Sequence, residues 1–127
     1  MSSQPINILA VDDDRVTLEL LSLVLEEYTT GEVLTFSDST EAISTIKARG
    51  DSLDLVISDM VMPDKNGLDV LAAYRKVNKL SPFLMLTANA TRDTVLSARK
   101  LGANAFVAKP FATHDLLDKM DAILSNN

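Results

Sequence analysis

Hydrophobic residues along the chain fall into two alternating kinds of segment. The first kind is short and almost continuously apolar, and several examples are bounded by Asp, Gly or Pro. Most of these segments are too short to be helices, and their pattern is typical of strands that are buried on both faces of a sheet. The predicted strands are Ile6–Val11, Val33–Phe36, Leu53–Ser58, Phe83–Thr87 and Ala105–Ala108.

The second kind of segment is longer and carries apolar residues at helical spacing. In the first of these segments, one stripe at i, i+4, i+7 and i+8 consists of Val16, Leu20, Leu23 and Val24, which predicts a helix. Further helices are predicted after Ser39, over Leu68–Val77, over Thr91–Leu101 and over Leu116–Leu124. Gly102 follows the fourth helix at the position that a C-terminal cap would occupy.

Strand and helix alternate five times without an internal repeat or a long linker. Alternation with connections of this length predicts right-handed crossovers and a parallel sheet that is covered by helices on both faces. The predicted fold class is α/β, a flavodoxin-like doubly wound (βα)5 sandwich whose five parallel strands lie in the order 2-1-3-4-5. We expect residues 1–127 to form a single domain with its core at about residues 6–124.

Composition and charge exclude several classes of protein. The chain has 12 Lys and Arg against 18 Asp and Glu, a formal net charge of −6. This balance argues against binding of nucleic acid or an anionic membrane by this domain, because phosphates require a basic face. Cys is absent, which excludes disulfides and thiolate metal sites. With no signal peptide and no apolar run near the ~20 residues of a membrane span, we expect a cytoplasmic protein.

Acidic residues follow two of the predicted strands, where a ligand site is expected in this fold class. Asp12–Asp14 follow the first strand and Asp59 follows the third, and the order 2-1-3-4-5 makes these strands neighbours. Carboxylates without His or Cys suit a hard cation such as Mg²⁺. Thr87 ends the fourth strand and Lys109 follows the fifth, and they could hold phosphoryl oxygens by hydrogen bond and by charge. These residues together predict Mg²⁺-dependent phosphorylation of an aspartate.

The motifs that carry these residues also match a known family. They are Val11-Asp12-Asp13, Asp59 followed by Met60-Val61-Met62-Pro63, Asn66-Gly67, Thr87-Ala88 and Lys109-Pro110-Phe111. In this order they closely resemble the receiver domain of two-component response regulators, in particular chemotaxis-regulator-like receivers, from about Ile6 to Leu124. Each motif alone is a weak signal, whereas five in order at strand ends are highly specific.

The resemblance implies a role for each residue of the acidic site. Asp59 would be the phospho-acceptor, and Lys109 would pair with the phosphoryl group. Asp13 and Asp59 would bind Mg²⁺, which Mn²⁺ could replace, together with the backbone carbonyl of Val61. Asp12 would contact the ion through water. Receivers in this family take the phosphoryl group from a histidine kinase or a histidine phosphotransfer protein.

The same resemblance implies a conformational switch. Thr87 would swing toward the phosphoryl oxygen, and Phe106 would rotate inward behind it. This movement would change the face formed by the fourth helix, the fifth strand and the fifth helix. Ala88 would contact the phosphoryl group through its backbone, while Asn89 and Val61 would influence the dephosphorylation rate. The peptide bond between Lys109 and Pro110 would be cis.

The downstream partner would be an effector protein or a fused output domain, and the domain would be a monomer or a phosphorylation-dependent dimer. It would catalyse only its own phosphorylation and dephosphorylation, so we do not expect an enzyme with an external product. Its signal would therefore be a change of surface and not a released molecule.

Several alternatives remain open at the sequence level. The acidic pair could be Asp12–Asp13 or Asp13–Asp14, and we favour the first because Asp14 would then cap the first helix.

The same run resembles the nucleophile motif of haloacid dehalogenase-type phosphatases, with Asp12 as nucleophile and Asp14 as acid/base, although the chain is short for that fold. A receiver that works only by protein contacts is a third possibility. A flavodoxin-type electron carrier is disfavoured, because the carboxylates would repel the FMN phosphate.

Overall fold

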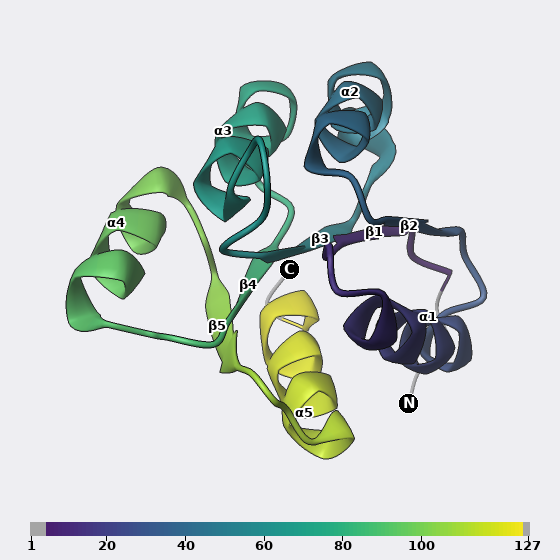
Figure 1. Ribbon diagram of the computed structural model, residues 1–127. Coiled ribbons are helices and arrows are strands. Elements are labelled where there is room, and N and C mark those ends of the chain that lie inside the picture. The colour runs from purple at the N-terminus through teal and green to yellow at the C-terminus, as the bar shows by residue number, and fades with distance from the viewer. Residues whose placement is uncertain (1–4, 126–127) are drawn as a thin grey trace.

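The computed structural model describes residues 5–125, which form a parallel sheet between two layers of helices (Figure 1). The strands are β1 (Ile8–Val11), β2 (Val33–Phe36), β3 (Leu55–Asp59), β4 (Phe83–Thr87) and β5 (Ala105–Ala108). The helices are α1 (Arg15–Tyr28), α2 (Ser39–Arg49), α3 (Gly67–Val77), α4 (Arg92–Leu101) and α5 (Thr113–Leu124), with a short 3-10 turn at Gly50–Ser52. The strand order is β2-β1-β3-β4-β5 and every pairing is parallel. The predicted fold class and strand order are confirmed.

A hydrophobic cluster on each face of the sheet joins it to its helices. On β1, Ile8 and Ala10 pack in the cluster with α1 and α5, whereas Leu9 and Val11 pack in the cluster with α2, α3 and α4. Successive side chains of a strand point to opposite faces, so a strand that is covered on both faces must be apolar at every position. This arrangement explains the continuous apolar runs in the sequence.

Two strands begin later than the sequence pattern predicts. β1 begins at Ile8 and not at Ile6, and β3 spans Leu55–Asp59 and not Leu53–Ser58. Asn7 and Asp54, which directly precede β1 and β3, bond to each other instead. The backbone N–H of Asn7 donates to Asp54 Oδ2 at 2.8 Å. The shift places Asp59 inside the sheet as the last residue of β3, in register with Leu86 of β4.

Helix α1 forms as predicted, but most of the apolar stripe that predicts it faces away from the sheet. Leu21 and Leu25 are fully buried, while Val16, Leu20 and Leu23 are 77%, 39% and 62% exposed. Apolar residues surround most of this helix, so periodicity identifies a helix without selecting the face that is buried. Val16, Leu20 and Leu23, hereafter the α1 stripe, therefore form an exposed apolar strip that begins beside the end of β1.

The helix ends follow the expected capping chemistry. Asp14 caps α1, since its carboxylate accepts hydrogen bonds from the Val16 N–H at 3.2 Å and from the Thr17 hydroxyl at 2.8 Å. The hydrogen bond from Thr17 is the main reason that the pKa of Asp14 is lowered. Gly102 ends α4 in the left-handed conformation, with φ of 110°, as predicted. Within residues 5–125, no helix is long and apolar enough to cross a membrane.

Candidate functional site

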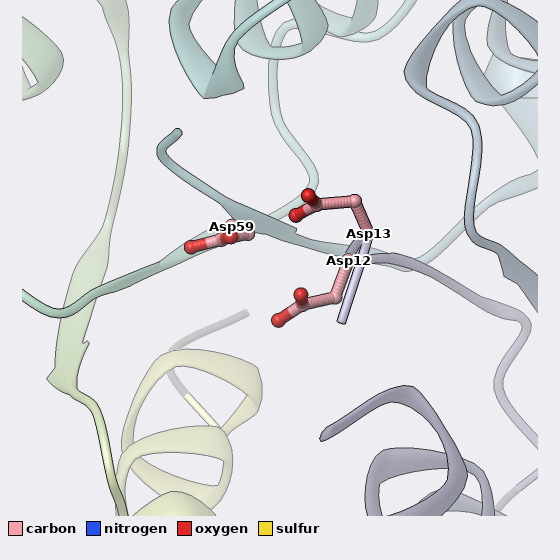
Figure 2. A group of neighbouring side chains, drawn as sticks. All are labelled: Asp12, Asp13 and Asp59. Atoms are coloured by element: carbon pink, nitrogen blue, oxygen red, sulfur yellow. The ribbon is translucent and has the colours of Figure 1, made fainter. Parts of the chain in front are cut away.

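Three carboxylates converge where β1 and β3 end (Figure 2). Asp12 and Asp13 follow β1 directly, and Asp59 is the last residue of β3. The parallel pairing of the two strands sets these ends side by side, with Val11 opposite Ser58. One carboxylate oxygen from each of the three residues lies within 4.8 Å of the others. The structure thus brings together residues that are 46 positions apart in the sequence.

The three carboxylates lie in different surroundings. Asp12 is fully buried and Asp59 is buried, whereas Asp13 is exposed. Asp12 is already partnered, because its Oδ1 accepts the backbone N–H of Asp14 at 2.9 Å. Burial raises the pKa of Asp59, and the negative charge of Asp12 raises it further, although Lys109 acts in the opposite direction.

Lys109, the residue that follows β5, supplies the positive charge of the site. Its Nζ lies 3.0 Å from Asp12 Oδ2 and 3.5 Å from Asp59 Oδ2. Burial by itself would lower the pKa of Lys109, but the hydrogen bond and charge of Asp12, together with Asp59, raise it overall. Lys109 therefore remains protonated at neutral pH. The peptide bond from Lys109 to Pro110 is cis, as the family resemblance implied.

Thr87 ends β4 at the same edge of the sheet and is buried. Its Oγ1 accepts the backbone N–H of Asn89 at 3.1 Å, and its carbonyl accepts the backbone N–H of Lys109 at 2.9 Å. Ala88 and Asn89 are exposed beside it. In the described part of the chain, no hydrogen bond joins the Thr87 hydroxyl to the three carboxylates, so its hydroxyl serves the local turn.

Phe106 lies on β5, in register with Met85 of β4. Its ring is partly buried against the cluster on the α2–α4 side of the sheet, and the guanidinium carbon of Arg99 lies 5.6 Å from the ring centroid. Phe106 also lines a cavity of about 400 Å³ together with Pro110, Phe111 and residues of α5. Phe106 is thus placed where β5, α4 and the surface near α5 meet.

The loop that follows Asp59, residues 60–66, returns closely against the sheet. Met60 and Met62 are buried, while Val61 between them is exposed. A side-chain carbon at Gly67 would lie 2.6 Å from the Asp59 carbonyl oxygen, so only glycine fits this contact. Nothing in the sequence pattern singles out Ser39 of α2, yet its hydroxyl bonds to the middle of this loop.

The family comparison agrees with this geometry. The sequence model of a protein family, the response regulator receiver domain, matches residues 8–121 of this chain. The chain therefore belongs to the response regulator receiver domain family of two-component systems. It is 37% identical over 117 residues to the transcriptional regulatory protein CpxR of Escherichia coli, covering 92% of this chain and 48% of that protein. The chain spans about half the length of the curated relatives it matches.

Solved structures share the fold over nearly the whole chain. The chemotaxis protein CheY4 of Vibrio cholerae superposes with a TM-score of 0.85 at 30% identity, covering 94% of this chain and 99% of that chain. CheY in the CheX–CheY–BeF3–Mg²⁺ complex of Borrelia burgdorferi gives a TM-score of 0.86 at 25% identity, covering 94% of this chain and 89% of that one. Both similarities agree with the flavodoxin-like order of the strands.

Family membership favours a receiver over a haloacid dehalogenase-type phosphatase. The phosphatase hypothesis requires Asp14 as acid/base, but the Asp14 carboxylate is exposed and bonded to Val16 and Thr17 at the start of α1. The carboxylates that gather at the strand ends are instead Asp12, Asp13 and Asp59. The geometry therefore agrees with Asp12–Asp13 as the acidic pair.

Proposed function

We propose that this domain is a signalling switch that accepts a phosphoryl group on Asp59 in a Mg²⁺-dependent step. The observation that carries the proposal is the convergence of three carboxylates within 4.8 Å, with Lys109 Nζ 3.5 Å from Asp59. The donor is a phosphohistidine on a histidine kinase or on a histidine phosphotransfer protein in the cytoplasm. Membership of the receiver family supports this choice of donor.

The donor atoms of the site fit a hard divalent cation. Mg²⁺ takes one or two carboxylates and completes its octahedron with other oxygen ligands and water, and Mn²⁺ accepts the same ligands. We assign Asp13, Asp59 and the backbone carbonyl of Val61 to the ion directly, and Asp12 through water. The bound ion would neutralise charge between the carboxylates and the incoming phosphoryl oxygens. The related CheY of Borrelia burgdorferi was solved with BeF3 and Mg²⁺.

Asp59 is the better nucleophile of the two buried carboxylates. Asp12 is fully buried and is held by Lys109 at 3.0 Å and by the Asp14 N–H, whereas the contact of Lys109 to Asp59 is longer, at 3.5 Å. An Asp59 oxygen forms the new bond to phosphorus while the bond from phosphorus to the donor imidazole nitrogen breaks. That nitrogen leaves with the electron pair. Lys109 then pairs with the transferred oxygens by charge, and the backbone N–H of Ala88 donates to them.

The acyl phosphate shifts a two-state equilibrium of the domain. The Thr87 hydroxyl leaves its bond with the Asn89 N–H and donates to a phosphoryl oxygen. Phe106 then rotates inward, which changes the surface of α4, β5 and α5 that an effector protein or a fused output domain recognises. Because Val61 and Asn89 are exposed in the loops that follow β3 and β4, they are placed to tune water access and hence the dephosphorylation rate.

The α1 stripe provides a surface on which the phosphodonor can dock. Its residues are apolar and exposed, and the first of them, Val16, lies three positions after Asp13. A partner that covers this stripe would bring its phosphohistidine to the neighbouring carboxylates and would exclude water from the reaction. The domain acts on itself as a monomer or as a phosphorylation-dependent dimer, and we propose no external product.

The proposal is tested by exposing the protein to a small phosphodonor such as acetyl phosphate and measuring its intact mass. We expect one added phosphoryl group with Mg²⁺, none with excess chelator and none in Asp59→Asn. Asp64→Asn is the matched control, because Asp64 is an exposed carboxylate in the following loop. Wild-type labelling of Asp59→Asn, or no labelling under any condition, would overturn the proposal. The second outcome would favour a receiver that works only by protein contacts.

A further inference from the structure

The loop of residues 60–66 is tied firmly at its two ends. At the start, the Met60 N–H donates to the Leu86 carbonyl at 2.8 Å, and at the end the Gly67 N–H donates to the Met60 carbonyl at 2.8 Å. The middle of the loop contains Asp64 with φ of 70°, a left-handed conformation that residues with side chains disfavour. The Lys65 N–H donates to the Pro63 carbonyl at 2.8 Å across Asp64, and a contact from outside the loop adds to this bond.

That contact comes from Ser39, the first residue of α2, whose side chain is buried with 2% of the residue exposed. The Ser39 hydroxyl donates to the Pro63 carbonyl at 3.0 Å and accepts the Lys65 N–H at 3.2 Å. Pro63 and Lys65 flank Asp64, so one hydroxyl forms hydrogen bonds with both neighbours of the residue in the left-handed conformation. Among residues 5–125, these are the only hydrogen bonds between residues 61–66 and α2.

The Ser39 hydroxyl is not needed to begin its own helix. The N-terminus of α2 is capped by Asp38, whose carboxylate accepts the Thr40 N–H at 2.9 Å. Both hydrogen bonds of the Ser39 hydroxyl therefore serve the loop and not α2. This separation makes it possible to loosen the loop by mutation while the cap of α2 stays intact.

From these contacts we propose that Ser39 is a positioning residue that fixes the loop for metal binding. The inference rests on the proposed function, in which the Val61 carbonyl is a ligand of Mg²⁺. A backbone carbonyl can point only where its loop directs it, and Val61 lies two residues before the Pro63 that Ser39 holds. Removal of the hydroxyl takes away its two hydrogen bonds and leaves Asp64 spanned by the bond from the Lys65 N–H to the Pro63 carbonyl alone, so the loop samples more conformations. Binding then has to order the loop again, which lowers the affinity for the ion.

The experiment compares Ser39→Ala with Ser44→Ala, an exposed serine in the middle of the same helix. The Mg²⁺ dissociation constant is measured on the unphosphorylated protein from backbone amide chemical shifts, and exchange of the Lys65 amide is followed in the same samples. We expect Ser39→Ala to raise the dissociation constant about three- to tenfold, the factor that one lost hydrogen-bonding group typically gives. Exchange at Lys65 should accelerate, and Ser44→Ala should behave as the wild type.

A second measurement is the Mg²⁺ concentration that gives half-maximal labelling by acetyl phosphate. It should rise by the same factor in Ser39→Ala, while the labelling rate at saturating Mg²⁺ stays within about twofold of the wild type. An unchanged Mg²⁺ dissociation constant in a less stable Ser39→Ala protein would mean a structural role alone and would overturn the inference. If wild-type Asp59 is never labelled but the Mg²⁺ dissociation constant shifts, the proposed function fails and the inference about Ser39 stands.

Discussion

Lys109 is the positive charge that allows two buried carboxylates to coexist, so its replacement by methionine is a direct test of the metal-free site. Methionine keeps much of the length of the side chain and its apolar character but removes the ammonium group. The substitution leaves Asp12, which is fully buried, and Asp59 without a cation. We expect the free energy of unfolding at pH 7 without metal to fall.

The size of the loss follows from the distances. With an effective dielectric constant near 20, the contacts of Lys109 Nζ at 3.0 Å to Asp12 and at 3.5 Å to Asp59 correspond to about 5.5 and about 4.7 kcal/mol of gross attraction. Desolvation of the ammonium opposes these values, and removal of one partner of a buried pair typically costs about 3–5 kcal/mol. Because the Lys109 side chain is 17% exposed, we expect the lower end, about 3 kcal/mol.

The loss should depend on pH with a defined sign. The pKa of Asp59 is raised by burial and by Asp12, so ionisation of Asp59 destabilises the folded state as pH rises through that pKa. Without Lys109 this cost grows, because no cation offsets the charge. The difference between wild type and Lys109→Met should therefore shrink as pH falls toward the ordinary Asp value and Asp59 becomes neutral. Saturating Mg²⁺ at pH 7 should also reduce it, because loss of the competing ammonium strengthens Mg²⁺ binding and the ion then stabilises the variant more than the wild type.

The assay is urea unfolding followed by far-ultraviolet circular dichroism at pH 7 and at pH 4.5, with and without Mg²⁺. Lys119→Met is the matched control, because Lys119 is exposed on α5 and makes no ion pair in the described structure. A loss of less than about 0.5 kcal/mol at pH 7, the range of ordinary surface substitutions, would refute the reasoning. So would a loss that grows as the pH is lowered.

Three further substitutions test other parts of the account. Asp13→Asn should raise the urea midpoint of the metal-free protein and weaken Mg²⁺ binding, and an unchanged or lowered midpoint would argue that the carboxylates are not crowded. Arg75→Met should lower the free energy of unfolding by about 3 kcal/mol, because the guanidinium donates to carbonyl oxygens of Asn78, Ser81 and Gly102. A loss as small as that of an exposed residue would contradict this role. Asn66→Ala should cost about 1 kcal/mol in thermal unfolding by removing the capping box of α3, and no change would show that the box does not stabilise the helix.

The fold and the gathering of the acidic residues follow from the sequence because they depend on order along the chain. Continuous apolar runs identify strands that are covered on both faces, and the alternation with helices fixes their direction. Parallel strands end at one edge of the sheet, which is sufficient to bring Asp59 to Asp12 and Asp13. No knowledge of side-chain packing is required for that step.

The features that could not be predicted depend on contacts between elements. Leucines surround much of α1, so only packing against the sheet decides that Leu21 and Leu25 are buried and Leu23 is not. The hydrogen bonds of the Ser39 hydroxyl join two elements whose separation in space is invisible in the sequence. The sequence indicated Lys109 as a partner of the phosphoryl group, whereas in this structure its nearest partner is Asp12.

The central claim is that Asp59 receives a phosphoryl group, and the most direct measurement is the position of the acyl phosphate. The protein is phosphorylated with Mg²⁺ by a phosphohistidine donor and reduced at once with borohydride, which converts a phosphorylated aspartate to homoserine. Peptide mass spectrometry then locates the homoserine. We predict homoserine at position 59 only, and none when a chelator replaces Mg²⁺. Homoserine at position 12 in place of position 59, or the same yield at position 59 in excess chelator, would contradict the account.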